Sequence, residues 1–272
     1  MTAGGAPLIV FANEKGGTGK STTAVHVAIA FAIAGRRVVA LDLDTRQRTL
    51  GRYMDNRIET RRRHGYDLLT PKYATFDPSA GLDVIEWLDT MGRDQDVVIV
   101  DTPGRHDIHS LAAIARAETL VTPINDSFLD LDLIGQVDPD NFALSRPSFY
   151  AKMVWEARKK RQESGRPNLA WVVLRNRLQH IQAGNMRRVG AALGELSMKV
   201  GFDFVPGLTE RVIYREWFTR GLTFMDLRGG VPRTVAADAE LKRLILALRL
   251  PGSDTLESLQ AMQREHSQPV AV

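Results

Sequence analysis

The sequence of 272 residues contains no cysteine. This absence excludes a disulfide framework, a zinc site with thiolate ligands and a thiol nucleophile. Long hydrophobic runs are missing too, since no stretch reaches the roughly eighteen apolar residues that a membrane-spanning helix needs. The first residues also lack the basic segment of a secretory signal peptide. A soluble, cytoplasmic protein without membrane contact is therefore the expectation.

The net charge is small, but the charge is unevenly distributed along the chain. The formal charge is +4, whereas residues 146–220 hold 15 Lys and Arg against 6 Asp and Glu, a net charge of +9. The remaining residues then carry −5. A basic segment of this kind suits a surface that faces a polyanion, and it suits solvated helix faces equally well.

Five short runs are apolar almost throughout and lead into polar residues: 8–12, 38–41, 97–100, 120–123 and 171–174. Strands that are apolar on both faces belong to parallel sheets covered by helices on both sides. Residues 24–34, after the first run, are typical of a buried helix. We therefore expect an α/β fold with a mainly parallel twisted sheet, helices on both faces, and binding groups at the carboxyl ends of the strands.

Three other segments give further expectations. Residues 52–79 have no clear periodicity and hold a basic cluster, which favours a surface excursion that is helical at its start. Residues 241–250 form an amphipathic helical pattern that stops at Pro251. We expect one domain over residues 1–250, followed by a tail over 251–272 that is partly helical or disordered.

The glycine-rich loop after the first run carries the strongest chemical signal. Residues 16–21 read Gly-Gly-x-Gly-Lys-Ser, a pattern expected by chance in roughly one chain of this length per thousand. Backbone N–H groups and the following helix N-terminus can bind phosphate there, so ATP and Mg²⁺ are the expected ligands. In such a loop the lysine contacts the β- and γ-phosphates, the serine binds Mg²⁺ and the threonine contacts the α-phosphate. The predicted nucleotide-binding residues of the loop are Lys15, Gly16, Gly17, Thr18, Gly19, Lys20, Ser21 and Thr22.

Carboxylates follow the second and third apolar runs, at the edge where the loop is expected. Asp42 and Asp44 alternate with period two and so project to the same side of their strand. Asp101 follows residues 97–100 as the carboxylate that would hold Mg²⁺ directly or through water. Phosphoryl transfer needs little beyond positioned charge, Mg²⁺ and an oriented water. The sequence therefore predicts an ATP-hydrolysing site.

The loop departs from the strict G-x-x-x-x-G-K-[ST] pattern, because Glu14 replaces the first glycine and Lys15 follows it. This resembles the deviant Walker A motif of the ParA/MinD family of P-loop ATPases. The resemblance implies that Lys15 reaches the nucleotide of a second subunit, so that ATP joins two protomers until it is hydrolysed. It also implies that Asp42 belongs to the metal shell. Asp44, Lys15 and Lys20 are the catalytic residues that the resemblance implies.

Longer runs resemble one branch of this family, the MipZ regulators of the division site: residues 13–17, 42–49, 122–128, 137–139, 171–177 and 211–216. The resemblance extends to about residue 250 and is weakest over 57–80 and in the tail. It implies an ATP-dependent homodimer that binds DNA without sequence preference, a ParB-like centromere-binding partner, and FtsZ as the protein whose polymerisation is blocked. It further implies a cytoplasmic protein found on the nucleoid and at the poles.

Two assignments rest on this resemblance together with the residues themselves. Asn176, at a strand end, matches the position that reads the adenine amino group, and helix capping is its alternative. Phosphate contacts need only Lys and Arg on one face, and such binding falls steeply with salt. The predicted DNA-binding residues are Arg187, Arg188, Lys199, Arg211, Arg215 and Arg220, with residues 158–161 as a rival basic surface.

Three other functions remain compatible with the sequence. One is a MinD-like ATPase that docks to lipid through residues 241–250, although core packing is the favoured interpretation of that helix. Another is a ParA-type partition ATPase that moves DNA without acting on division. The third is a metabolic enzyme on the same scaffold, and the absence of cysteine argues against an iron–sulfur carrier.

Overall fold

The computed structural model describes residues 5–125, 127–138, 144–176, 183–206, 208, 213–226 and 235–248. Seven strands form a central sheet in the order β3-β2-β4-β1-β5-β8-β9, and every neighbouring pair is parallel. The strands are β1 (Leu8–Phe11), β2 (Val38–Asp42), β3 (Lys72–Thr75), β4 (Val97–Asp101), β5 (Thr119–Asn125), β8 (Ala170–Asn176) and β9 (Asp203–Pro206). All five predicted strands are confirmed.

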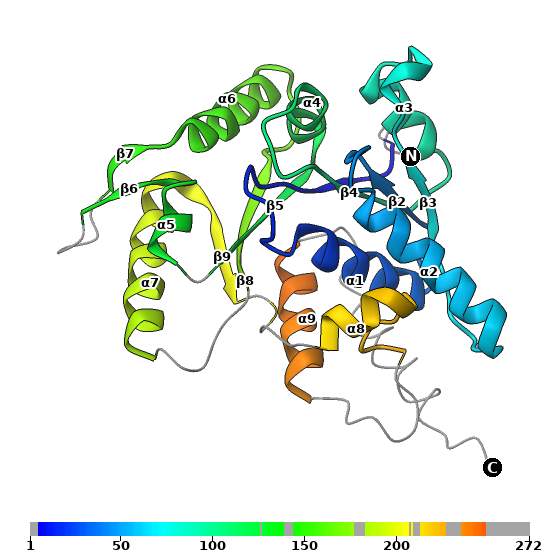
Figure 1. Ribbon diagram of the computed structural model, residues 1–272. Helices are drawn as coiled ribbons and strands as arrows, with labels where there is room; N and C mark the ends of the chain where they lie inside the picture. Colours follow the sequence, from blue (N-terminus) through cyan, green and yellow to red (C-terminus); the bar gives the residue numbers. More distant parts are fainter. Residues whose placement is uncertain are drawn as a thin grey trace.

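Helices cover both faces of this sheet (Figure 1). One face carries α1 (Lys20–Ile33), α2 (Thr49–His64), α8 (Ile213–Arg220) and α9 (Val235–Ala247). The other carries α3 (Val84–Met91), α4 (Ile108–Arg116), α6 (Phe149–Glu163) and α7 (Ala183–Leu196). Shorter elements are the 3₁₀ turn Pro78–Ala80, α5 (Phe128–Leu131), the π-helical turn Ser197–Gly201, and an antiparallel pair of β6 (Gly135–Val137) and β7 (Leu144–Pro147). The predicted α/β architecture is confirmed.

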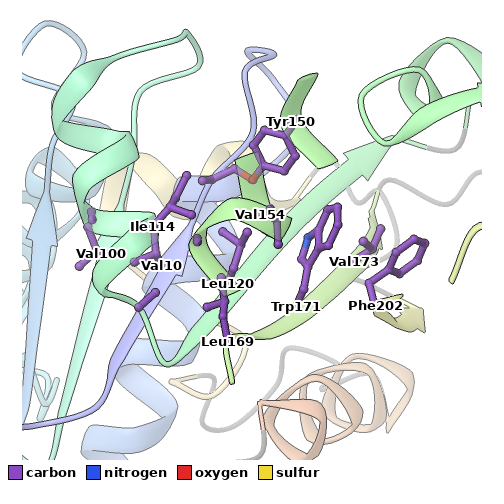
Figure 2. Packing of buried hydrophobic residues seen from close by; sticks show 14 of the residues in the cluster. Val10, Val100, Ile114, Leu120, Tyr150, Val154, Leu169, Trp171, Val173 and Phe202 are labelled. Carbon is purple, nitrogen blue, oxygen red and sulfur yellow. The ribbon is translucent and has the colours of Figure 1, made fainter. Parts of the chain in front are cut away.

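Side chains of the central strands alternate between two hydrophobic cores. Val10 of β1 packs under α4 and α6 together with Val100 and Leu120, whereas Ile9 and Phe11 face α1. Figure 2 shows the first core, where Trp171 of β8 lies near Tyr150 of α6 and Phe202. Successive residues of a strand point to opposite faces, so strands between two helical layers must be apolar at every position. This requirement explains why the predicted strands are uninterrupted apolar runs.

The structure corrects one prediction, the surface excursion over residues 52–79. Its helical start is confirmed by α2, but the interpretation as a surface excursion is wrong, because Tyr53, Met54 and Arg57 are buried and β3 extends the sheet. Arg57 is fully buried because Asp226, far away in the sequence, pairs with its guanidinium. A local pattern shows only the basic residue and not its distant partner.

The helix predicted near residue 241 packs in the core. In α9 and the turn after it, Leu241, Leu244, Ile245 and Leu248 are buried against the α1 side of the sheet. This burial confirms core packing over lipid docking for these four side chains. Among the residues that the structure describes, no helix is long and apolar enough to cross a membrane. The predicted tail over 251–272 lies outside the described residues.

Candidate nucleotide-binding site

The glycine-rich loop connects β1 to α1 at the carboxyl edge of the sheet. Gly17 and Gly19 have φ values of +74° and +87°, which L side chains rarely adopt. A Cβ on Gly19 would lie 2.2 Å from Nδ2 of Asn176. No side chain caps the first turn of α1, which begins at Lys20. The loop therefore presents backbone and an uncapped helix N-terminus, the arrangement that binds phosphate in P-loop proteins.

A cavity of about 280 Å³ lies against this loop. The structure brings the predicted Asp44 and six of the eight predicted loop residues together around it, while Lys15 and Thr18 do not line it. Sequence reasoning missed five further lining residues, which follow the carboxylates of β2 and β4. The lining residues are Gly16, Gly17, Gly19, Lys20, Ser21, Thr22, Asp44, Gln47, Thr49, Thr102, Gly104 and Arg105.

Lys20 lines the cavity and is held by a hydrogen bond within the loop. Its Nζ donates a hydrogen bond of 2.9 Å to the carbonyl oxygen of Lys15, and its side chain is buried. Burial lowers the pKa of Lys20, while the nearby carboxylates of Asp101 and Asp44 act in the opposite direction. The amine is therefore placed between the loop and the two carboxylates, where a phosphate charge would stabilise its protonated form.

Asp42 and Asp101 end adjacent strands in register with one another. The oxygens of Asp42 accept hydrogen bonds from the N–H groups of Asp44 (2.9 Å) and Gly51 (3.1 Å). Both oxygens of Asp101 are buried and have no hydrogen bond of ordinary geometry within the described part of the chain. Burial, and secondarily the charge of Asp42, raises the pKa of Asp101 to about 8, although Ser21 and Lys20 favour its ionised form. These oxygens beside Ser21 fit a Mg²⁺ ion, whereas the oxygens of Asp42 are engaged by backbone.

The raised pKa of Asp101 predicts how stability depends on pH without nucleotide and Mg²⁺. The folded protein keeps this proton up to about pH 8, whereas the unfolded chain releases it near 3.8, so stability falls as pH rises. Relative to Asp101→Asn, we expect the free energy of unfolding of the wild type to fall by up to about 1.4 kcal/mol per pH unit between about pH 4 and 8. Urea unfolding across this range tests the prediction. Parallel curves for the two proteins would contradict it.

Asp44 lies at the cavity wall and organises the turn that leads into α2. Its Oδ1 accepts hydrogen bonds from the N–H groups of Arg46 (3.2 Å) and Gln47 (3.1 Å). Its side chain is largely buried while lining the cavity. This position suits the predicted orientation of an attacking water, and that role stays a prediction.

Lys15 points away from the cavity of its own protomer. Its Nζ donates to the carbonyl oxygen of Leu129 (2.6 Å) and to Oδ1 of Asp130 (2.9 Å). Asp130 also accepts a hydrogen bond of 2.8 Å from the N–H of Asn125 at the end of β5. Asp130 is not among the residues predicted from the sequence, because the run that resembles the family ends at residue 128. The amine of Lys15 is thus held beside α5, outside the cavity lining.

Asn176 lies at the end of β8, behind the loop. Its Nδ2 donates to the carbonyl oxygen of Thr18 (2.9 Å), and its Oδ1 accepts from the N–H of Leu208 (3.0 Å). The side chain therefore joins the loop to the segment after β9, and it caps no helix in these contacts. The adenine contact of Asn176 stays a prediction.

The predicted DNA-binding residues that the structure describes lie on three separate elements. Arg188 on α7, Lys199 in the π-helical turn and Arg220 on α8 are exposed. Arg187 and Arg215 belong to α7 and α8, but their side chains lie outside the description, as does the whole of Arg211. In the rival cluster over 158–161, Arg161 is buried and pairs with Glu118 at 3.4 Å, so it cannot serve a phosphate-binding surface.

Comparison with known proteins identifies a matching family and a curated relative. The family model described as ATPase MipZ matches residues 7–252. The chromosome partitioning protein ParA of Myxococcus xanthus (strain DK1622) is 26% identical over 158 residues, which are 48% of this chain and 56% of that protein. The chain thus spans little more than half the length of the curated relative that it matches.

Solved structures share the fold at low sequence identity. Apo McdA from Cyanthece superposes with a TM-score of 0.62 at 17% identity, covering 89% of this chain and 99% of that one. MinD of Pyrococcus horikoshii OT3, complexed with Mg-ADP, gives 0.60 at 17% identity over 91% and 98%. A putative plasmid partition protein of Borrelia burgdorferi B31, bound to AMPPNP, gives 0.57 at 14% identity over 89% and 98%.

The family match covers most of the chain, including the loop, the carboxylates at the strand ends and the strand that carries Asn176. The solved structures share this fold at 17% identity. Both findings agree with the family that the deviant loop predicts. The chain belongs to the MipZ family of ATPases.

Proposed function

We propose that this protein is a nucleotide-controlled switch that dimerises on ATP, hydrolyses it, binds DNA without sequence preference and positions cell division by inhibiting FtsZ polymerisation. The observation that carries the proposal is the cavity in which Lys20, Ser21 and Asp44 meet, with Asp101 buried behind them. These groups match the needs of phosphoryl transfer, namely a cation, a metal-binding pair and a carboxylate that faces the nucleophile.

Each residue has a distinct role in the proposed hydrolysis. Lys20, already held between the loop and two carboxylates, binds the β- and γ-phosphates in place of the carbonyl of Lys15. Ser21 and the unengaged oxygens of Asp101 would hold Mg²⁺, which when bound neutralises charge on the phosphates. Asp44, which lines the same cavity, orients the attacking water.

Dimerisation follows from the position of Lys15. Its amine lies outside the cavity of its own protomer, bound to Asp130, and must leave that carboxylate to meet a second nucleotide. Two protomers that exchange this lysine would bury both nucleotides between them, so the lifetime of the dimer is set by hydrolysis. A two-fold dimer also doubles the number of exposed cations, which couples DNA affinity to ATP.

We propose a ParB-like centromere-binding protein and FtsZ as partners, and a cytoplasmic location on the nucleoid and at the poles, because the sequence resembles the MipZ regulators. The alternative is a ParA-type partition ATPase without action on division, and the ParA relative from Myxococcus xanthus is named for chromosome partitioning. Both functions share the ATP-dependent dimer, so only an assay of the target protein separates them.

We expect the Asp44→Ala protein with Mg-ATP to lower FtsZ sedimentation to the level seen without GTP. Loss of Asp44 keeps the dimer ATP-bound, which is the form proposed to act on FtsZ. The matched control is Lys15→Ala, which retains the cavity but lacks the amine for the second protomer, and it should leave sedimentation unchanged. Unimpaired FtsZ polymer with the Asp44→Ala protein would favour the partition ATPase.

A further inference from the structure

Arg105 contributes to the cavity a positive charge that lies outside the P-loop motif. It belongs to the loop after β4, lines the cavity and is exposed. Across the described chain it forms no ion pair, whereas Arg37, Arg57, Arg116 and Arg161 each pair with a carboxylate. Its guanidinium is therefore available to an anionic ligand.

The backbone before Arg105 is fixed against the phosphate-binding loop. Thr102 donates through its hydroxyl (2.9 Å) and its N–H (3.2 Å) to the carbonyl oxygen of Phe11 on β1. A Cβ on Gly104 would lie only 3.0 Å from the Cα and N atoms of Gly16. Arg105 thus follows a residue that rests directly on the loop, so its side chain starts from a defined point at the cavity wall.

The position of Arg105 in the cavity indicates which phosphate of a bound nucleotide it would contact. The cavity is lined by the loop and the start of α1 together with residues that follow β2 and β4, among them Asp44 and Arg105. In a P-loop site the loop backbone cradles the inner phosphates, and the terminal phosphate extends toward the metal and the nucleophile. Arg105 lines the cavity together with Asp44, the residue that is proposed to orient the nucleophile.

We propose that Arg105 binds the terminal phosphate of ATP within its own protomer and thereby makes the site select ATP over ADP. This inference rests on the proposed function, because it requires the cavity to bind ATP. A guanidinium forms paired, charge-assisted hydrogen bonds to phosphate oxygens, and ADP lacks the oxygens that Arg105 would contact.

We expect Arg105→Ala to weaken binding of Mg-AMPPNP by about 10- to 100-fold and to leave the affinity for Mg-ADP unchanged. Isothermal titration calorimetry of the full chain measures both. Arg105→Lys keeps the charge but not the planar guanidinium, so its affinity for Mg-AMPPNP should lie between the affinities of Arg105→Ala and the wild type. The matched control is Arg93→Ala, an exposed arginine remote from the cavity, which should bind both nucleotides like the wild type.

Repeating the titrations in a Lys15→Ala background separates a phosphate contact from a contact across the dimer. The selective loss should persist there, and its disappearance would overturn the assignment to the same protomer. Equal losses for AMPPNP and ADP, or no loss, would overturn the inference. A wild-type protein that binds neither nucleotide would instead contradict the proposed function.

Discussion

Truncation of Arg57 to alanine is expected to lower the free energy of unfolding by about 3–5 kcal/mol, the cost of breaking a buried ion pair from one side. The side chains of Arg57 and Asp226 are 0% and 5% exposed, and two hydrogen bonds of 2.6 Å join them. The guanidinium also donates to the carbonyl oxygens of Leu69 (2.9 Å) and Gly221 (3.0 Å). Alanine would leave a buried carboxylate and two carbonyls without these donors.

Urea unfolding without nucleotide measures this effect, and α2 supplies its own control. Arg62 pairs with Glu59 on the exposed side of the same helix, so Arg62→Ala should leave the free energy of unfolding nearly unchanged. An equally small cost for Arg57→Ala would show that the Arg57–Asp226 pair is solvated in solution. The pair joins α2, which begins just after the turn held by Asp44, to the residues that follow α8. Loss of the pair should therefore destabilise α2 and the residues that follow α8 together.

The sheet and the phosphate loop could be predicted from the sequence because their signals are local. An apolar run that ends in a carboxylate indicates both a strand and the end of it that carries functional groups, as residues 97–100 and Asp101 show. Strand β3 escaped prediction because it lies at the sheet edge and is only partly buried, so residues 72–75 lack a continuous apolar run. Strand β9 is likewise a short edge strand.

Contacts between distant residues account for what the sequence could not show at the site. Asp130 binds Lys15 across 115 positions, and Asn176 binds Thr18 across 158. Arg105 looks like an ordinary surface residue until β4 is placed beside β1, which brings Gly104 against the loop. The fold therefore completes the site from residues that no spacing rule connects.

Replacement of Asp44 by alanine is expected to lower the rate of ATP hydrolysis by about 100-fold or more, the contribution typical of a positioned catalytic carboxylate. ATP binding should persist, because the loop and Lys20 do not depend on this side chain for their position. Asp44 also holds the N–H groups of Arg46 and Gln47, so Asp44→Asn, which keeps an acceptor oxygen there, is the matched variant. Both variants should show this loss of rate if the carboxylate acts on water. Activity retained by the asparagine variant would assign Asp44 a purely structural role.

The opposite behaviour is expected of Lys15→Ala. This change removes the amine that Asp130 holds outside the cavity and leaves every lining residue in place. The variant should bind ATP as a monomer, whereas the Asp44→Ala protein should accumulate as a dimer that hydrolysis no longer separates. Two substitutions in the same site thus predict opposite oligomeric states.

Gel filtration of these two variants and the wild type with Mg-ATP, followed by DNA binding at fixed salt, tests the proposed switch most directly. We expect the Asp44→Ala protein to elute as a dimer and retain DNA, and the Lys15→Ala protein to elute as a monomer and release it. Identical elution and identical DNA binding of the two variants would contradict the account.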